Sequence, residues 1–510
     1  MVASDGVTTL RDQAIAPLSR ADAERLLQTL PLGRQTLERR VLRARCLKYL
    51  GSFDVAWAGL TDLMPAVKDP MLRARVAVDL VHLAYYLARA DEAARLTVLA
   101  QDDAAGDPLL LAELRLGTSI NLTAANDVTG ALTEARWAED ALVAAPRGRS
   151  RDLVMARLQR QLAHLHSHAA DYRAAKTAAD MTVRLASRIN DAWESASGTY
   201  VLGFAAWYGG RTDEAVEHFT KAEGVLSPYR SSLWRYTLLC LSAARMQRGE
   251  LAEGDRLARQ SATGASEDLA HLALLRGDGE VAERILARAP KGCPADEHFR
   301  DFVRGFVRAQ QGDPRAGIRM LEDLASEFGS RGMEHWAIGA SVHAAYWREQ
   351  VVRGAGAARA AHLVRDIGAR GGEGFAYYLP EVAVWLGRAA ERDAAAGPLA
   401  RSIRARGESA IRRAQSDADV PLRTSKLDEA TFHLRASGLT WRELGILREL
   451  ERVRGEGAGL DRAMLAARLG VSPNTLRVHL TRIRAKLDVG DKRGDEVLLE
   501  AALAQSARSA

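Results

Sequence analysis

YVLGFAAWYGGRTDEAVEHFTKAEG, residues 200–224, contains one complete helical hairpin pattern. A first helix ends in small and aromatic residues before Gly209 and Gly210, and a second begins with an acidic pair and Ala215. Glycine at a helix end tolerates the left-handed backbone conformation that turns the chain. Gly203 and Ala215 are small enough to let two paired helices approach closely. This stretch therefore predicts two antiparallel helices packed side by side.

Similar turns return along the chain from about residue 20 to residue 395. They read LGSFDVAW (50–57), ARADEAAR (88–95), DYRAAKTA (171–178), GGRTDEAVEHF (209–219), RGELAEGDR (248–256), RGDGEVAERIL (276–286) and QGDPRAGIRML (311–321). Several successive turns lie about 38 residues apart and one gap is shorter, so the array is degenerate. Hairpins repeated at this spacing indicate an α-solenoid, whose concave surface is free for a ligand. The alternative is an irregular all-α domain.

The quoted hairpin resembles a tetratricopeptide repeat. The resemblance rests on Leu202-Gly203, Tyr208, Gly210, Ala215, Phe219 and Ala222. It implies a tetratricopeptide-like helical repeat domain, which we place at 19–395 behind a flexible N-terminal segment, 1–18. Aromatic residues are spread along this domain. At helical spacing we expect them more often in the core than on a ligand platform.

The C-terminal region contains two further helices with a sharp turn between them. The first runs from about Asp461 to Leu469, and Gly470 supplies a left-handed turn residue. In the second, Ser472 is a good N-cap and Pro473 fits the first helical position. One buried stripe follows, at Leu476, Leu480, Ile483 and Leu487. The pair predicts a helix-turn-helix.

The opposite face of the second helix suits DNA. It carries Asn474, Arg477, Val478, Thr481 and Arg484, which combine amide, guanidinium and small apolar groups. Such groups match base edges and phosphates in a major groove. Residues 461–493 contain eight cations and three anions, a net +5 of the chain's +6. That concentration of charge favours nucleic acid, whereas the bland alternative is an amphipathic helix pair inside a helical protein.

Three pieces of this region resemble the LuxR/NarL type of four-helix DNA-binding domain. They are LT-x-RE at 439–443, LAARLGVSPNTLRVHLTRIRAKL at 465–487 and a short apolar helix at about 495–503. The resemblance covers about the last 80 residues and implies a DNA-binding domain at 429–510. Two features depart from the family. Trp441 stands where proline is usual, and the connection RVRGEGAGL (452–460) is longer, as in winged-helix response regulators.

The resemblance also implies roles for individual residues and partners. Arg477, Val478 and Thr481 match base-facing positions of the family. Candidate phosphate contacts are Asn474, Thr475, Arg484 and Lys486, and Ser472 and Arg482 complete the DNA-binding set. Family members commonly bind as dimers, so a homodimer on double-stranded DNA is expected, with RNA polymerase as a further partner. The preceding residues, 396–428, predict an Arg-rich helix with a solvated face and a linker around Pro421.

Motifs of catalysis are absent from the sequence. It contains no G-x-x-x-x-G-K-[ST], G-x-S-x-G or H-E-x-x-H. The chain therefore resembles only the C-terminal half of maltose-activator-type regulators, without their ATPase. His164, His166 and His168 form one histidine cluster, which we interpret as a polar helix surface rather than a metal site. We predict no enzyme activity, cofactor or phospho-receiver domain.

Composition fits a soluble all-α protein. Hydrophobic residues make up 47% and charged residues 27%, and alternating strand-forming patterns are scarce. Cys46, Cys240 and Cys293 lie far apart, which fits a reducing compartment. Neither a signal peptide nor a membrane-spanning run is evident. We expect a cytoplasmic protein, at the nucleoid when bound to DNA.

Together these patterns predict a transcription regulator. Its repeat domain would sense a small molecule, peptide or protein and control a C-terminal DNA-binding domain. The alternative is a repeat scaffold whose C-terminal helices dock a protein such as a sigma or anti-sigma factor.

Overall fold

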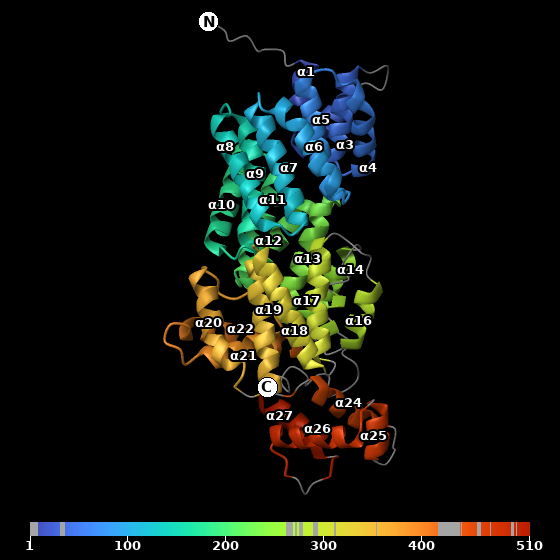
Figure 1. Cartoon of the computed structure of the whole chain (residues 1–510), viewed down its shortest axis with the longest axis vertical. Helices are drawn as coiled ribbons and strands as arrows, with labels where there is room; N and C mark the ends of the chain where they lie inside the picture. Colours follow the sequence, from blue (N-terminus) through green and yellow to red (C-terminus); the bar gives the residue numbers. More distant parts are fainter. Residues whose placement is uncertain are drawn as a thin grey trace.

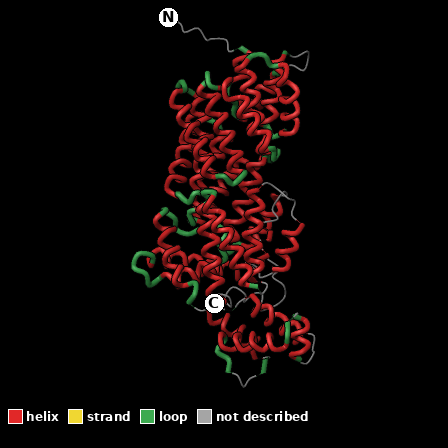
Figure 2. Tube along the Cα trace, in the orientation of Figure 1, coloured by secondary structure: helices red, strands yellow, loops and turns green. Residues whose placement is uncertain are grey.

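The computed structural model is helical throughout the part of the chain that it describes (Figure 2). The described residues are 9–30, 36–261, 269–270, 273–274, 279–288, 294–310, 313–352, 354–416, 439, 441–455, 461–469, 471–490, 494–495 and 497–509. Gly470, to which the sequence assigned a turn, lies outside this set. The predicted all-α class is confirmed.

Helices of the N-terminal half are α1 (Leu10–Ile15), α2 (Arg20–Thr29), α3 (Leu37–Tyr49), α4 (Phe53–Leu63), α5 (Pro70–Tyr86), α6 (Ala90–Ala104), α7 (Pro108–Ala124), α8 (Val128–Ala144), α9 (Arg149–His168), α10 (Tyr172–Ile189), α11 (Ala192–Tyr208) and α12 (Thr212–Leu226). Helices of the C-terminal half are α13 (Ser232–Gln247), α14 (Leu251–Ser261), α16 (Gly279–Arg288), α17 (Pro294–Gln310), α18 (Pro314–Ser330), α19 (Glu334–Val351), α20 (Ala357–Ala369), α21 (Pro380–Ala390), α22 (Gly397–Ser416), α24 (Trp441–Gly455), α25 (Arg462–Arg468), α26 (Pro473–Lys486) and α27 (Val497–Ser509).

Helices α3 to α22 stack as antiparallel hairpins into an elongated, tetratricopeptide-like solenoid (Figure 1). The small bundle α24–α27 lies at the end opposite the N-terminus (Figure 1). Within the quoted hairpin, α11 and α12 are in close contact, because a Cβ placed on Gly203 would lie 2.7 Å from the Phe219 ring. Small residues therefore set the helix spacing, as the sequence predicts.

A residue in the left-handed backbone conformation ends the first helix of several hairpins. In six hairpins the turn after the first helix holds a residue at positive φ, namely Gly51, Ala88, Asn126, Ala170, Gly210 and Gly249. The next N–H then bonds back into the helix, as Ser52 does to the carbonyl of Leu47 at 3.0 Å. This Schellman-type turn satisfies carbonyls that the helix end leaves open. The turn at Asn126 was missing from the sequence prediction because asparagine takes the place of glycine there.

Later hairpins fold back onto earlier ones and close the solenoid. The Val128 N–H donates to the Arg331 carbonyl at 3.1 Å, which joins the α7–α8 turn to the α18–α19 turn. Likewise the Glu373 N–H donates to the Gly209 carbonyl at 2.7 Å. Aromatic side chains fill the space between, and Trp207 and Trp347 are almost fully buried. The prediction that aromatics serve mainly as core is confirmed for these residues.

Two predicted boundaries are wrong. The flexible N-terminal segment does not reach residue 18, because α1 forms there behind a Thr9–Asp12 capping box and buries Ala14. The Arg-rich helix belongs to the solenoid rather than to a linker, because α22 packs along α21. The side chains that α22 buries are Ala400, Ile403, Ala410, Ile411 and Ala414. Residues 417–428 of the predicted linker lie outside the described set.

The turns give a stability prediction. Ala88 is exposed and held at φ 53°, where its Cβ is strained. Ala88→Gly should therefore raise the free energy of unfolding by about 1 kcal/mol. Ala94→Gly is the matched control, since Ala94 is exposed within α6 and its loss should cost about 1 kcal/mol. Urea unfolding followed by circular dichroism measures both. Equal destabilisation by the two changes would contradict the left-handed turn.

Candidate nucleic-acid interface

The α24–α27 bundle is built around a continuous apolar core. Helix α24 contacts α26 and α27, and α25 contacts α26. The buried side chains are Leu439, Leu444, Ile446, Leu447, Leu450, Val453, Leu465, Ala466, Leu476, Leu480, Ile483, Leu487, Leu498, Leu499 and Ala502. The predicted buried stripe of α26 is thus confirmed, and the core determines which side of α26 faces outward.

Local capping sets the ends of α25 and α26. The Asp461 side chain accepts the Ala463 N–H at 2.9 Å, and Ser472 Oγ accepts the Thr475 N–H at 3.0 Å. Pro473 occupies the first position of α26, where a missing N–H costs nothing. Between the helices the Val471 N–H returns to the Ala466 carbonyl at 3.0 Å. The two helices therefore begin where the sequence predicts.

A row of exposed side chains follows the outer side of α26. This row, the α26 stripe, comprises Asn474, Thr475, Arg477, Val478, Thr481, Arg482 and Ala485. Val478 is 44% exposed, which is unusual for a branched apolar side chain in a small bundle. Arg477 Nη2 donates to Asn474 Oδ1 at 2.8 Å, so two polar members are held together. In the described part of the chain, neither Arg477 nor Arg482 forms an ion pair with an acid.

Arg484, a predicted phosphate contact, points into the bundle instead. It is only 7% exposed and pairs with Asp495, in the loop before α27. Asp495 also receives Arg462 Nε, from the start of α25, at 2.6 Å. Burial raises the pKa of Asp495, but hydrogen bonds from Arg462 and Arg484 outweigh it and hold that pKa below its usual value. Arg484 therefore holds three segments together, and its assignment to the DNA face is wrong.

Lys486 is likewise occupied within the bundle. Its Nζ lies 2.7 Å from Glu443 Oε2, and the Glu443 side chain is only 2% exposed. Glu443 stands in the first turn of α24, so this pair ties the end of α26 to the start of α24. Sequence reasoning missed the anchoring role of Glu443 and Asp495 because each lies on a different element from its cationic partner. Lys486 is half-buried and is a weak candidate for phosphate.

Two histidines of the cluster, His164 and His168, pack against aromatic rings rather than forming a polar helix surface. The rings of His164 and Phe204 lie 4.4 Å apart, and those of His168 and Tyr208 lie 5.2 Å apart. Burial lowers the pKa of His164 to about 3 and that of His168 to about 4, so both stay neutral at pH 7. Among the described residues, no group of three potential metal ligands occurs. These histidines belong to the aromatic packing of the solenoid.

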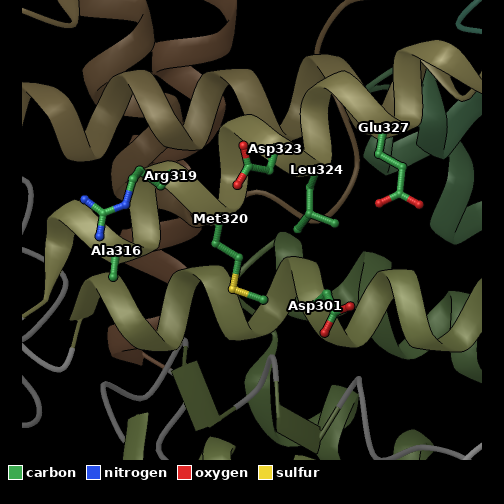
Figure 3. Close-up of a pocket in the computed structure, with 7 residues that line it drawn as sticks. All are labelled: Asp301, Ala316, Arg319, Met320, Asp323, Leu324 and Glu327. Atoms are coloured by element: carbon green, nitrogen blue, oxygen red, sulfur yellow. The ribbon is translucent and has the colours of Figure 1, made fainter.

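A shallow surface hollow lies between α17 and α18 (Figure 3). It is lined by Asp301, Ala316, Arg319, Met320, Asp323, Leu324 and Glu327. Small-molecule sites are mostly apolar and enclosed, with few polar groups. Here charged side chains predominate, so the hollow does not provide such a site.

Comparisons with known proteins support the solenoid. No family model and no curated protein matches the chain. Among solved structures, a Rap protein complexed with competence and sporulation factor is similar over 66% of this chain and 99% of its own, with 11% identity and a TM-score of 0.53. The apo form of RapI matches 55% of this chain and 99% of its own, with 12% identity and a TM-score of 0.33. At such identities the first match establishes a shared fold alone.

No described helix is long and apolar enough to cross a lipid bilayer. The side chains of Cys46 and Cys240 are buried.

The anchoring of Arg484 gives a testable distinction. Asp495→Asn removes the shared acid of Arg462 and Arg484 and should destabilise the bundle by about 3 kcal/mol. Because the folded pKa of Asp495 is lowered, its contribution is complete above about pH 4 and is lost as the pH falls further. Hydrogen exchange of α26 amides in the full chain measures the effect. The exposed Asp488→Asn is the control, and equal exchange rates in the two variants would refute the anchoring role.

Proposed function

We propose that this protein is a DNA-binding transcription regulator. The bundle α24–α27 binds double-stranded DNA through α26, and the solenoid binds a small molecule, peptide or protein that controls this binding. The observation that carries the proposal is the α26 stripe. It combines two arginines that form no ion pair with a described acid, an Arg477–Asn474 hydrogen bond and an exposed Val478 on one side of a single helix.

Each group of the stripe has a chemical counterpart in a major groove. Guanidinium and amide groups such as Arg477 and Asn474 donate to base edges, and Val478 suits a thymine methyl group. Arg482, on the flank of the stripe, is placed for phosphate. Ser472 and Thr475 stand at the N-terminal end of α26, where backbone N–H groups also favour a phosphate. Arg484 and Lys486 act indirectly, by fixing the orientation of α26.

A single small bundle offers few contacts, so the functional unit is a homodimer on two half-sites. Joining two weak half-sites raises the overall affinity without new contacts at either one. RNA polymerase is the expected partner of the DNA-bound dimer. The role is one of binding and regulation rather than catalysis.

The α26 stripe also contains the feature that favours the rival function. Val478 is an exposed apolar side chain at its centre, as at a site that docks a protein. A scaffold that docks a sigma or anti-sigma factor would use the same surface. Salt distinguishes the two, because release of counterions makes DNA binding fall steeply with ionic strength.

The full-length protein should retard fragments of its own genome in a gel-shift assay, with an affinity that falls steeply as salt rises. Arg477→Ala should weaken binding to the selected fragment about 10- to 100-fold, through loss of a base contact. Arg482→Ala should lower the slope of log affinity against log salt by about 1. Selection of DNA co-purified with the protein supplies the fragment.

Arg235→Ala is the matched control, since Arg235 is exposed on α13, far along the chain from α26. It should leave affinity and salt slope unchanged. If the wild-type chain retards no genomic fragment at low salt, the proposal is wrong and protein docking becomes the better account of the α26 stripe.

A further inference from the structure

The N-terminal end of the solenoid contains three buried arginines, each on the first helix of a hairpin. Arg45 lies on α3, Arg75 on α5 and Arg157 on α9. Each has an acidic partner on a neighbouring element, and these partners are Asp79, Glu113 and Glu194 respectively. Buried ion pairs seldom add net stability over an apolar core, so a cluster of them at one place indicates another role.

Two of these arginines bind the backbone of the chain's own N-terminal segment. Arg45 Nη1 donates to the Ala14 carbonyl at 2.7 Å, and Arg45 Nη2 donates to the Ala16 carbonyl at 2.9 Å. Arg157 Nη2 donates to the Leu18 carbonyl at 2.7 Å. The segment from Ala16 to Ser19 is not helical, and Ser19 ends it as the N-cap of α2. It is therefore held as an extended peptide would be, by its carbonyl groups.

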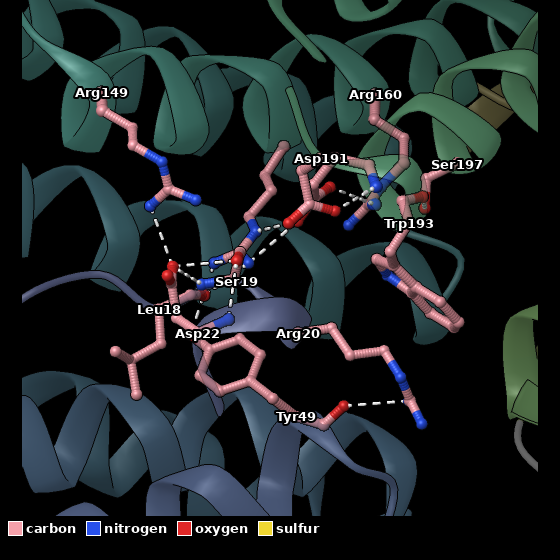
Figure 4. A network of polar contacts seen from close by, with 12 residues as sticks. Leu18, Ser19, Arg20, Asp22, Tyr49, Arg149, Arg160, Asp191, Trp193 and Ser197 are labelled. Atoms are coloured by element: carbon pink, nitrogen blue, oxygen red, sulfur yellow. Dashed lines mark hydrogen bonds and ion pairs between the residues drawn. The ribbon is translucent and has the colours of Figure 1, made fainter. Parts of the chain in front are cut away.

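Further contacts continue along the same strip of chain. Arg149 Nη1 pairs with Asp22 Oδ2 at 2.9 Å (Figure 4). Arg20 donates to the Tyr49 carbonyl at 3.2 Å, and its guanidinium lies 4.9 Å from the ring centre of Trp193 (Figure 4). Residues far apart in sequence, on α3, α9 and α11, thus converge on one short segment.

Arg75, on α5, differs from the other two arginines, because its hydrogen-bond partner is Glu113 and not the N-terminal segment. The side chain is 1% exposed and donates to Glu113 through Nη2 alone. Among the described residues, no hydrogen-bond acceptor reaches its Nε or Nη1. Buried donors without acceptors cost free energy, and most native structures avoid them. These two donors lie on α5, the helix that also carries Asp79, the partner of Arg45.

The recognised groups are backbone carbonyls, which every peptide carries. Arginine donors that bond to carbonyls therefore bind an extended chain of any sequence. Contacts to its side chains then select among peptides. In the chain's own N-terminal region, the side chains that make such contacts are the buried Pro17 and Leu18 and the acid Asp22, which pairs with Arg149. If the segment left, Arg45 and Arg157 would lose these carbonyl acceptors, and another peptide backbone could supply the same groups.

We infer that the surface formed by Arg45 and Arg157 is a binding site for a short peptide, which residues 14–19, the end of α1 and the extended stretch after it, occupy in cis and an incoming peptide displaces. We call it the arginine site. The ligand has an apolar residue at the place of Leu18 and an acid near the place of Asp22. This inference deepens the proposed effector binding by the solenoid, but it does not depend on DNA binding by α26.

The test uses a labelled synthetic peptide of residues 9–22 and a chain that lacks residues 1–19. Fluorescence anisotropy should show saturable binding to the truncated chain and at least about tenfold weaker binding to the full chain, whose own segment competes. Arg157→Ala in the truncated chain should weaken binding about tenfold or more, since a charged hydrogen-bond donor is lost. Arg184→Ala, exposed on α10, should leave it unchanged.

A peptide in which Leu18 and Asp22 are both replaced by alanine controls for nonspecific attraction, and it should bind the truncated chain weakly. Equal binding of the two peptides, or no binding to a truncated chain that melts cooperatively, would overturn the inference.

If the truncated chain does not fold, full-length Leu18→Asp takes its place, because the new charge disfavours the buried position of the cis segment. In that variant, peptide binding should be tighter than in the wild type, and amides of residues 9–19 should exchange hydrogen faster. Peptide binding no tighter than that of the wild type would overturn the inference. Gel shifts run separately report on the DNA function, so failure of one activity leaves the other measurable.

Discussion

Six hairpins of the solenoid each depend on one residue held in the left-handed region at the end of the first helix. That residue reverses the chain within a few positions, and the following N–H returns to the helix it has just left. Because the reversal is tight, the second helix must run beside the first, and small residues such as Gly203 then set the distance between them. Such hairpins then stack on one another, since each unit can bury its apolar side only on its neighbours.

The sequence could predict what repeats and what has helical period. The hairpin at 200–224 and the buried stripe of α26 both follow local rules, and both appear as expected. The predictions were wrong where a side chain pairs with a charged residue on a different element. Arg484 has a helical position near the outer face, but Asp495 draws it inward. The Asn126 turn shows a milder case, since asparagine tolerates the left-handed conformation but does not signal it as glycine does.

Arginines in this protein serve three physical purposes, which are distinguished by the partners of their guanidinium groups. In the C-terminal bundle, Arg484 and Arg462 share Asp495, and the result is a fixed orientation for α26. In the solenoid, Arg45 and Arg157 also have acidic partners, but part of each guanidinium remains for a peptide carbonyl. The exposed Arg477 and Arg482 form the third class, since no acid neutralises them in the described part of the chain. Charge that is left unpaired at the surface is available for phosphate.

Helix α11 joins the arginine site to the last helix of the solenoid. Near its start, Glu194 holds Arg157, and beyond its end the carbonyls of Gly209 and Gly210 accept hydrogen bonds from Glu373 and from Arg406 of α22. The helix spans 17 residues, a length of about 25 Å, and most of its side chains are buried. Because most of α11 is packed in the core, a shift of Glu194 on exchange of the cis segment would reach α22 through α11 and the Arg406 side chain. Coupling of sites requires an element with two arrangements that both sites bias. The cis segment, bound or displaced, supplies the two arrangements, and α11 supplies the connection toward the helix that precedes the C-terminal bundle.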